Sequence, residues 1–314
     1  MKTITIIFTL LISLSLFANN DNWDNDFYLK NLSPDHKLDI CTGAADDATN
    51  CINPSENPLR FSKAAKESFK QLMTEYGLAI APGFNQPGET LGSKGFELGV
   101  NYSFSKVGSV KVDGETPWQG TYGGANPGSL NLVTIEARKG LPWSFEAGGK
   151  ISYIFGSHLF VFGVSGKFAL IESVGYAPDL SIRGTYSTLM GSKEVTMDVK
   201  TLDAIISYDF SLGGMMALAP YFAYSLTKIT ANSSDILINS TRSPYTCESN
   251  SDYCDYEDDK EYDNRVDKFD TFNKTSHRFI VGFRLHNAAF VLTPEVIFST
   301  DNVWTINTKV GFDF

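Results

Sequence analysis

The sequence is short of the residues that most catalytic and metal-binding sites use. Its 314 residues include only four His and four Cys, and they contain no nucleophile elbow, HExxH pair or P-loop. Positive charge is also scarce, because 26 Lys and Arg stand against 36 Asp and Glu, for a net charge of −10. Nucleic-acid binding needs a basic surface. The composition therefore excludes nucleic acid as a partner, and the motifs give no indication of an enzyme.

Long hydrophobic runs are absent after the first residues. The chain opens with Lys2, a mostly apolar run from Ile4 to Leu16, and Ala18, which together predict a signal peptide over residues 1–18. A membrane-anchoring helix is the alternative, but the run is too short to cross a bilayer. No later stretch reaches the roughly 18 apolar residues of a membrane-spanning helix. Any membrane crossing by the mature chain must therefore use β-strands.

Strict alternation of apolar and polar residues is the strongest pattern present. In the last segment, Phe314, Phe312 and Val310 lie on one face of a strand, and Asp313 and Lys309 lie on the other. Comparable alternation recurs in ten segments, each long enough to cross a membrane when tilted. The expected strands are residues 95–107, 130–138, 145–153, 160–170, 180–187, 195–210, 216–229, 278–285, 290–298 and 303–314.

The lengths of the connections between these segments favour a membrane barrel. The two longest, residues 106–129 and 231–274, follow the first and seventh strands. Both would therefore fall on the same side of a membrane, as the long extracellular loops of such barrels do. The prediction is an all-β protein, an antiparallel up-and-down transmembrane β-barrel of ten strands over residues 95–314. Eight or twelve strands are the alternatives.

The end of the chain carries a family signal. A strand that stops on Phe314, with Phe312 and Val310 two and four positions earlier, resembles the C-terminal strand of bacterial outer-membrane β-barrel proteins. The resemblance implies a place in the outer membrane in contact with its lipid, and recognition of the tail by the barrel assembly machinery. It identifies no subfamily, and we expect a monomer. We predict a narrow or plugged pore for passive passage of a small solute. The alternative is a structural or surface-binding, adhesin-like barrel that acts through its extracellular loops.

Residues 19–94 are expected to form an N-terminal periplasmic or plug segment. Within it, apolar residues at helical spacing predict a helix over about 58–76, with Pro58 at its first turn and Gly77 at its stop. Residues 77–95 are interpreted as a linker. The apolar stripe of the helix must be buried. Two places remain open for it: inside the barrel as a plug, or against the periplasmic face.

Charged residues of both signs recur on the polar faces of the predicted strands. Facing a narrow lumen, they would have to pair with one another. The predicted lumen charge network consists of Glu97, Glu146, Lys150, Lys167, Arg183, Asp203, Asp209, Arg278, Arg284, Glu295 and Lys309. A structural network that holds the wall together and a narrow selective channel are the two interpretations.

The cysteines form two local pairs, Cys41 with Cys51 and Cys247 with Cys254. In an exported protein this pattern predicts two disulfides, and the spacing does not suit a zinc site. The second pair lies in an acidic stretch, whose weak candidate ligands for Ca²⁺ are Asp255, Glu257, Asp258 and Asp259. A solvated acidic loop is the alternative, and no other cofactor is expected.

Overall fold

The computed structural model describes residues 29, 63–81, 84–112, 116–118, 128–172, 174, 177–234, 236–238 and 265–314. Several predicted features lie outside these residues. They are the signal peptide, both cysteine pairs, the acidic candidates at 255 and 257–259, and the first residues, 58–62, of the expected helix.

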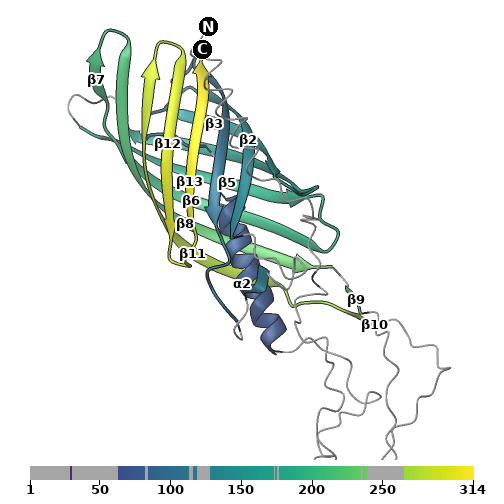
Figure 1. Ribbon diagram of the computed structural model, residues 1–314. Helices are drawn as coiled ribbons and strands as arrows, with labels where there is room; N and C mark the ends of the chain where they lie inside the picture. Colours follow the sequence, from purple (N-terminus) through teal and green to yellow (C-terminus); the bar gives the residue numbers. More distant parts are fainter. Residues whose placement is uncertain are drawn as a thin grey trace, which may run out of the picture.

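Ten long strands close into an antiparallel barrel (Figure 1). They are β1 (Phe96–Lys106), β2 (Ser129–Leu141), β3 (Phe145–Ile154), β4 (Phe160–Ile171), β5 (Asp179–Met190), β6 (Val195–Ser207), β8 (Met216–Ser233), β11 (Phe272–Asn287), β12 (Phe290–Ser299) and β13 (Trp304–Asp313). Pairing of β13 with β1 closes the ring, and β8 pairs with β11. The predicted ten-stranded barrel is confirmed.

Three short strands extend two of the hairpins. Strand β7 (Phe210–Gly213) follows β6 and pairs with the first residues of β8. Strand β9 (Ile236–Ile238) pairs with β10 (Arg265–Asp267), and both lie between β8 and β11 in the sequence. The sixth strand was expected to reach residue 210, but β6 ends at Ser207. The next partner along β8 is Pro220, which has no N–H to donate, so the ladder breaks at this point.

Strands β8 and β11 are longer than the sequence suggested. Residues 231–274 were expected to form a loop, yet β8 continues to Ser233 and β11 begins at Phe272. The strand expected to end at residue 285 also continues further, because β11 runs through Asn287 and the turn falls on the next two residues.

The outer surface of the barrel is apolar. Along β1, Phe96, Leu98 and Val100 are exposed, whereas Glu97 and Asn101 on the opposite face are buried. Aromatic side chains gather at two levels, as they do at the two interfaces of a membrane barrel. The pairs nearer the C-terminus of the chain are Phe96–Phe314, Phe145–Phe168 and Phe290–Phe312, and those at the other level are Phe104–Trp304, Tyr153–Phe160 and Tyr224–Phe279.

The two ends of the barrel differ in their connections. At the end where β1 begins and β13 stops, which we call the turn mouth, strands are joined by short turns such as 142–144 and 288–289. The opposite end, the loop mouth, carries the connections 107–128 and 234–271. In bacterial barrels the short turns are periplasmic and the long loops extracellular. The turn mouth is therefore the periplasmic end.

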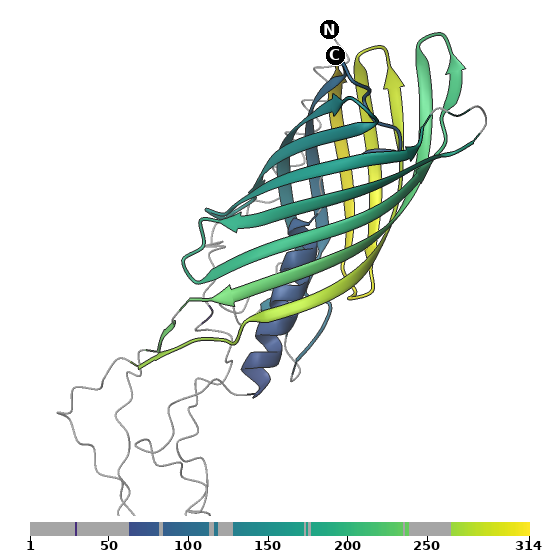
Figure 2. The same ribbon diagram turned by 180° about the vertical axis from the view of Figure 1, so that it is seen from behind.

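One helix, α2 (Lys63–Ile80), runs from the loop mouth into the ring of strands (Figures 1 and 2). It packs against β6, β8 and β11. The predicted stop at Gly77 is wrong, since the helix continues to Ile80. Gly77 instead permits close packing: a Cβ there would lie 2.7 Å from Cγ2 of Ile229 on β8.

Candidate functional site

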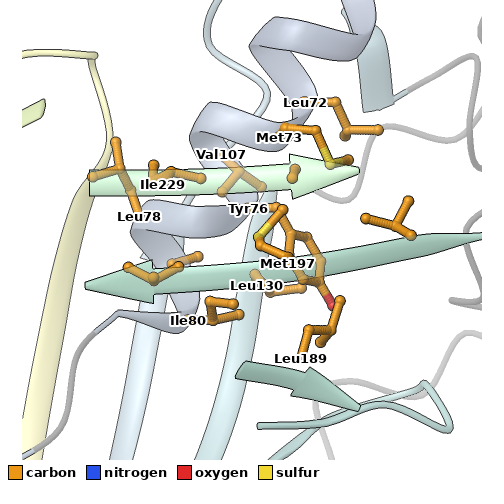
Figure 3. Close-up of a cluster of buried hydrophobic side chains, with 14 of the residues drawn as sticks. Leu72, Met73, Tyr76, Leu78, Ile80, Val107, Leu130, Leu189, Met197 and Ile229 are labelled. Carbon is orange, nitrogen blue, oxygen red and sulfur yellow. The ribbon is translucent and has the colours of Figure 1, made fainter. Parts of the chain in front are cut away.

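The half of the lumen next to the loop mouth is apolar and filled by α2. Residues 72–80 of the helix are all buried. They pack on inward-facing side chains of the wall, among them Met197 of β6 and Ile229 of β8 (Figure 3). A helix satisfies its own backbone hydrogen bonds, so the wall around it needs to supply only apolar surface.

A loop-mouth connection folds onto the helix and covers it. Glu75 of α2 is buried, and its carboxylate accepts hydrogen bonds from the Trp118 indole N–H (2.6 Å) and from the Gly108 amide (2.6 Å). The Trp118 ring stacks on Tyr76, with ring centroids 6.0 Å apart. Gly108 and Trp118, in the described parts of the connection after β1, therefore contact the helix at the extracellular end.

The half of the lumen next to the turn mouth is polar and holds an extended segment, residues 84–91. We call this segment and α2 together the plug. Cationic side chains of the wall donate to carbonyl oxygens in and just before the extended segment. They are Arg183 to Phe84 O, Lys309 to Asn85 O, Lys167 to Pro87 O (3.3 Å) and Glu89 O, and Lys150 to Ile80 O and Ala81 O (3.4 Å each).

Four amides of the same segment are bound as well. Their acceptors are carboxylates and a hydroxyl of the wall or its turns: Phe84 N donates to Glu136 (2.9 Å), Gly88 N to Ser207 Oγ (2.9 Å), Thr90 N to Glu172 (2.6 Å) and Leu91 N to Glu146 (3.1 Å). A buried extended chain has no internal ladder, so each of its polar groups needs an outside partner. The charged wall supplies those partners.

The wall charges also pair among themselves around Glu97. This carboxylate contacts Lys309 Nζ at 2.8 Å, Arg284 Nη2 at 3.0 Å and the guanidinium of Arg138. Arg138 also contacts Glu146 at 2.8 Å and donates to the side chain of Gln86 in the plug. The residues come from β1, β2, β3, β11 and β13, so the network ties together strands far apart in the sequence.

A second group comes from β5, β6, β8, β12 and β13. Arg183 pairs with Asp203 at 2.7 Å, and Glu295 accepts hydrogen bonds from Tyr221 (2.7 Å) and Asn307 (2.9 Å). Next to them, a cavity of about 10 Å³ is lined by Arg183, Asp203, Glu295 and Arg278, among others. That is space for a single water.

Most of the predicted network residues are buried in the lumen, and one is not. Asp209 is exposed, because the break after Ser207 ends the alternation that would have turned it inward. The segment that these charges bind was not recognised from the sequence. The stretch interpreted as a linker, with Asn85 and Gln86 at its centre, is the extended part of the plug.

Asp209 has a neighbour in the plug. Burial, together with hydrogen bonding and repulsion by the nearby carboxyl of Asp209, raises the pKa of the Glu89 carboxyl to about 8. Asp209 lies between β6 and β7, at the turn mouth. The two acids therefore lie near each other at the periplasmic rim.

The remaining predicted sites are the tail of the last strand and a metal site. Val310, Phe312 and Phe314 lie on the outward face of the last strand, and Phe314 exchanges backbone hydrogen bonds with Phe96. Recognition of this tail by the assembly machinery stays a prediction. Within the described residues, no group of three or more His, Cys, Asp or Glu is placed to hold a metal ion.

No family model and no curated protein matches the chain. Among solved structures, the attachment invasion locus protein Ail of Yersinia pestis matches with 11% identity, 71% of this chain, 99% of that chain and a TM-score of 0.25. The N-terminal β-barrel domain of OprF from Pseudomonas aeruginosa matches at 12% identity, 71% and 99% coverage, and a TM-score of 0.27. The outer membrane protein Omp33 of Acinetobacter baumannii gives 10%, 70%, 98% and 0.26. Scores this low add nothing to what the barrel's own geometry supports.

That geometry is the one a bilayer requires. Pairing closes the ten long strands into a ring, the outer face of the ring is apolar between two aromatic levels, and its buried charges point inward. Among the described residues, no helix is long and apolar enough to span a membrane. The protein is a bacterial outer-membrane β-barrel, with helix α2 ahead of its first strand.

Proposed function

We propose that this protein is a sealed outer-membrane barrel that acts as a structural or surface-binding element at its extracellular face, and that it is not an open pore. The observation that carries the proposal is the plug. Its helix fills the apolar half of the lumen, and its extended segment is bound on both its carbonyl and its amide groups in the polar half.

The strength of the seal is supported by the number of independent contacts. Lys150, Lys167, Arg183 and Lys309 all donate to backbone oxygens of the plug or its helix end, and all four are buried. Charge-assisted hydrogen bonds are roughly twice as strong as neutral ones. Releasing the plug would leave several of these cations in the lumen without those partners, which is costly. No catalytic step forms part of the proposal.

The pore for a small solute that the sequence suggested is the second candidate. One observation favours it: the same cations would line the lumen if the plug were to leave, and a ring of cations selects anions. A gated pore and a sealed scaffold therefore differ in whether the plug ever departs.

Conductance in planar bilayers separates the two. The full-length protein should give no channel steps, and a variant without residues 63–80 should give steps that favour anions over cations. Gly166→Val, which adds a side chain on the outer face of β4 where a Cβ meets nothing within 4 Å, is the matched control and should stay silent. Frequent steps from the full-length protein would overturn the sealed-barrel proposal, even if the deletion variant fails to fold.

A further inference from the structure

The direction in which the plug crosses the lumen has a consequence for the part of the chain that precedes it. Its last residues lie at the turn mouth. Gly88 bonds to Ser207, the final residue of β6. A Cβ on Gly140, near the end of β2, would lie 1.8 Å from the carbonyl oxygen of Gly92. The plug therefore joins β1 at the periplasmic end, where β1 begins.

The first turns of α2 lie at the opposite end. The Phe69 ring stacks on that of Phe269, with centroids 4.4 Å apart and planes within 5°. Lys66 contacts the carboxylate of Asp270 at 3.7 Å. Phe269 and Asp270 directly precede β11 at the loop mouth. The helix therefore enters the barrel from the extracellular end.

A third contact supports this direction independently of the helix. Leu29 is buried in the same apolar cluster as α2, and its amide donates a hydrogen bond to Glu194. Glu194 lies in the turn between β5 and β6, which is at the loop mouth. A residue far ahead of α2 in sequence is thus also bound at the extracellular end.

We propose that the plug is an eleventh crossing of the outer membrane and that α2 begins at the cell surface. Ten strands return the chain to the side on which the first strand began. One additional crossing through the lumen places the start of α2 and the end of β13 on opposite sides of the membrane. The inference deepens the proposed function and rests on it in part, because it brings the start of the sealing helix to the extracellular face beside Phe269 and Asp270.

The proposal differs from what the sequence suggested, which was a periplasmic location or a plug for residues 19–94. It also gives the plug a purpose beyond closure. The apolar face of α2 and the bound backbone of residues 84–91 hold a continuous polypeptide across the membrane without a spanning helix in lipid. The barrel wall then serves as the anchor of its own N-terminal segment.

Surface accessibility of an epitope tag tests this directly in the full chain. A tag inserted after Glu56 is compared with one after Ser192, in the β5–β6 turn at the loop mouth, and one after Gly214, in the β7–β8 turn at the turn mouth. On intact cells, antibody should bind the Glu56 and Ser192 tags to the same extent, within about twofold, and should miss the Gly214 tag. After permeabilisation of the outer membrane all three should be bound. If the Glu56 tag behaves like the Gly214 tag, the proposal is wrong.

Trypsin treatment of intact cells gives a readout without any insertion. Cleavage after Arg60 in the unaltered protein should release the segment ahead of α2 while the barrel keeps its heat-modifiable mobility on gels. Cleavage at this site only after permeabilisation would overturn the proposal. Neither readout depends on conductance. A barrel that conducts yet exposes residue 60 would refute the sealed-barrel function and leave the crossing intact, and a silent barrel with a periplasmic tag would do the reverse.

Discussion

The two halves of the lumen hold the same polypeptide in opposite ways. Near the loop mouth the wall presents apolar side chains such as Met197, Val199 and Ile229 to a helix. Near the turn mouth it presents buried charges such as Arg138 and Lys309 to an extended chain. The same alternation of inward and outward residues generates both surfaces, so the barrel geometry does not distinguish them.

The difference follows from what each form of the backbone needs. The helix has already satisfied its interior N–H and C=O groups, and apolar contact adds to its stability without leaving polar groups unpaired. The extended segment brings carbonyls and amides that lack intrachain partners into the buried lumen, and each would cost free energy if left unpaired. Lys and Arg reach the carbonyls, and Glu and Ser reach the amides. The chemistry of the wall matches the backbone that it surrounds.

The largest expected effect is in the polar half. Lys309→Met should lower the free energy of unfolding by about 3–5 kcal/mol, because it leaves the carboxylates of Glu97 and Glu136 buried without one of their cations. Urea unfolding from lipid vesicles measures this change. The matched control is Lys200→Met on the exposed face of β6, which should change stability by no more than about 0.5 kcal/mol. Equal costs at the two sites would show that the lumen charges do not act as a paired network.

A smaller effect is expected in the apolar half. Gly77→Val would place methyl groups against Ile229, and overpacking of this kind costs about 1–3 kcal/mol. Adding Ile229→Ala should recover part of that loss, and the two changes should therefore be non-additive. Gly166→Val on the outer face serves as the control. Simple additivity in the double-mutant cycle would contradict direct packing of the helix on β8.

The smallest effect concerns the periplasmic rim and appears as a pH dependence. Because the pKa of Glu89 rises from its ordinary value of 4.5 to about 8 in the folded protein, the stability from its protonated form is fully present below pH 4.5. It is lost as the pH rises toward 8. Glu89→Gln cannot ionise, so its denaturation midpoint should fall less between about pH 5 and about pH 9. Glu67→Gln, on the exposed side of α2, should follow the unaltered protein. If the denaturation midpoints of the Glu89 variant and the parent protein changed in parallel with pH, Glu89 would not be the group that titrates.

The strands could be predicted because a membrane barrel displays its two faces in the sequence. One example is the last strand, where Phe312 and Val310 lie on the outward face and Asp313 and Lys309 lie on the other. The prediction weakened where strands leave the apolar band. The outward residues Thr230 and Asn232 of β8 are polar, so the last residues of that strand have the composition of a loop.

The site was less accessible from the sequence, for two physical reasons. Charges at alternate positions indicated which residues face inward, but their main partners in the plug are backbone atoms, which every residue carries. Gly77 posed the second problem, because a glycine that ends a helix and one that lets a helix approach a strand look alike in sequence. Contact with Ile229 distinguishes the two.

Hydrogen exchange at residues 84–91 tests the central claim most directly, because that claim is an extended chain sealed in the lumen by the wall. The amides of Phe84, Gly88 and Leu91 donate to wall groups, so they should exchange as slowly as those of the barrel strand β6, over hours or longer. Exchange of these amides at the rate of an unstructured peptide, while β6 stays protected, would contradict the occupied lumen.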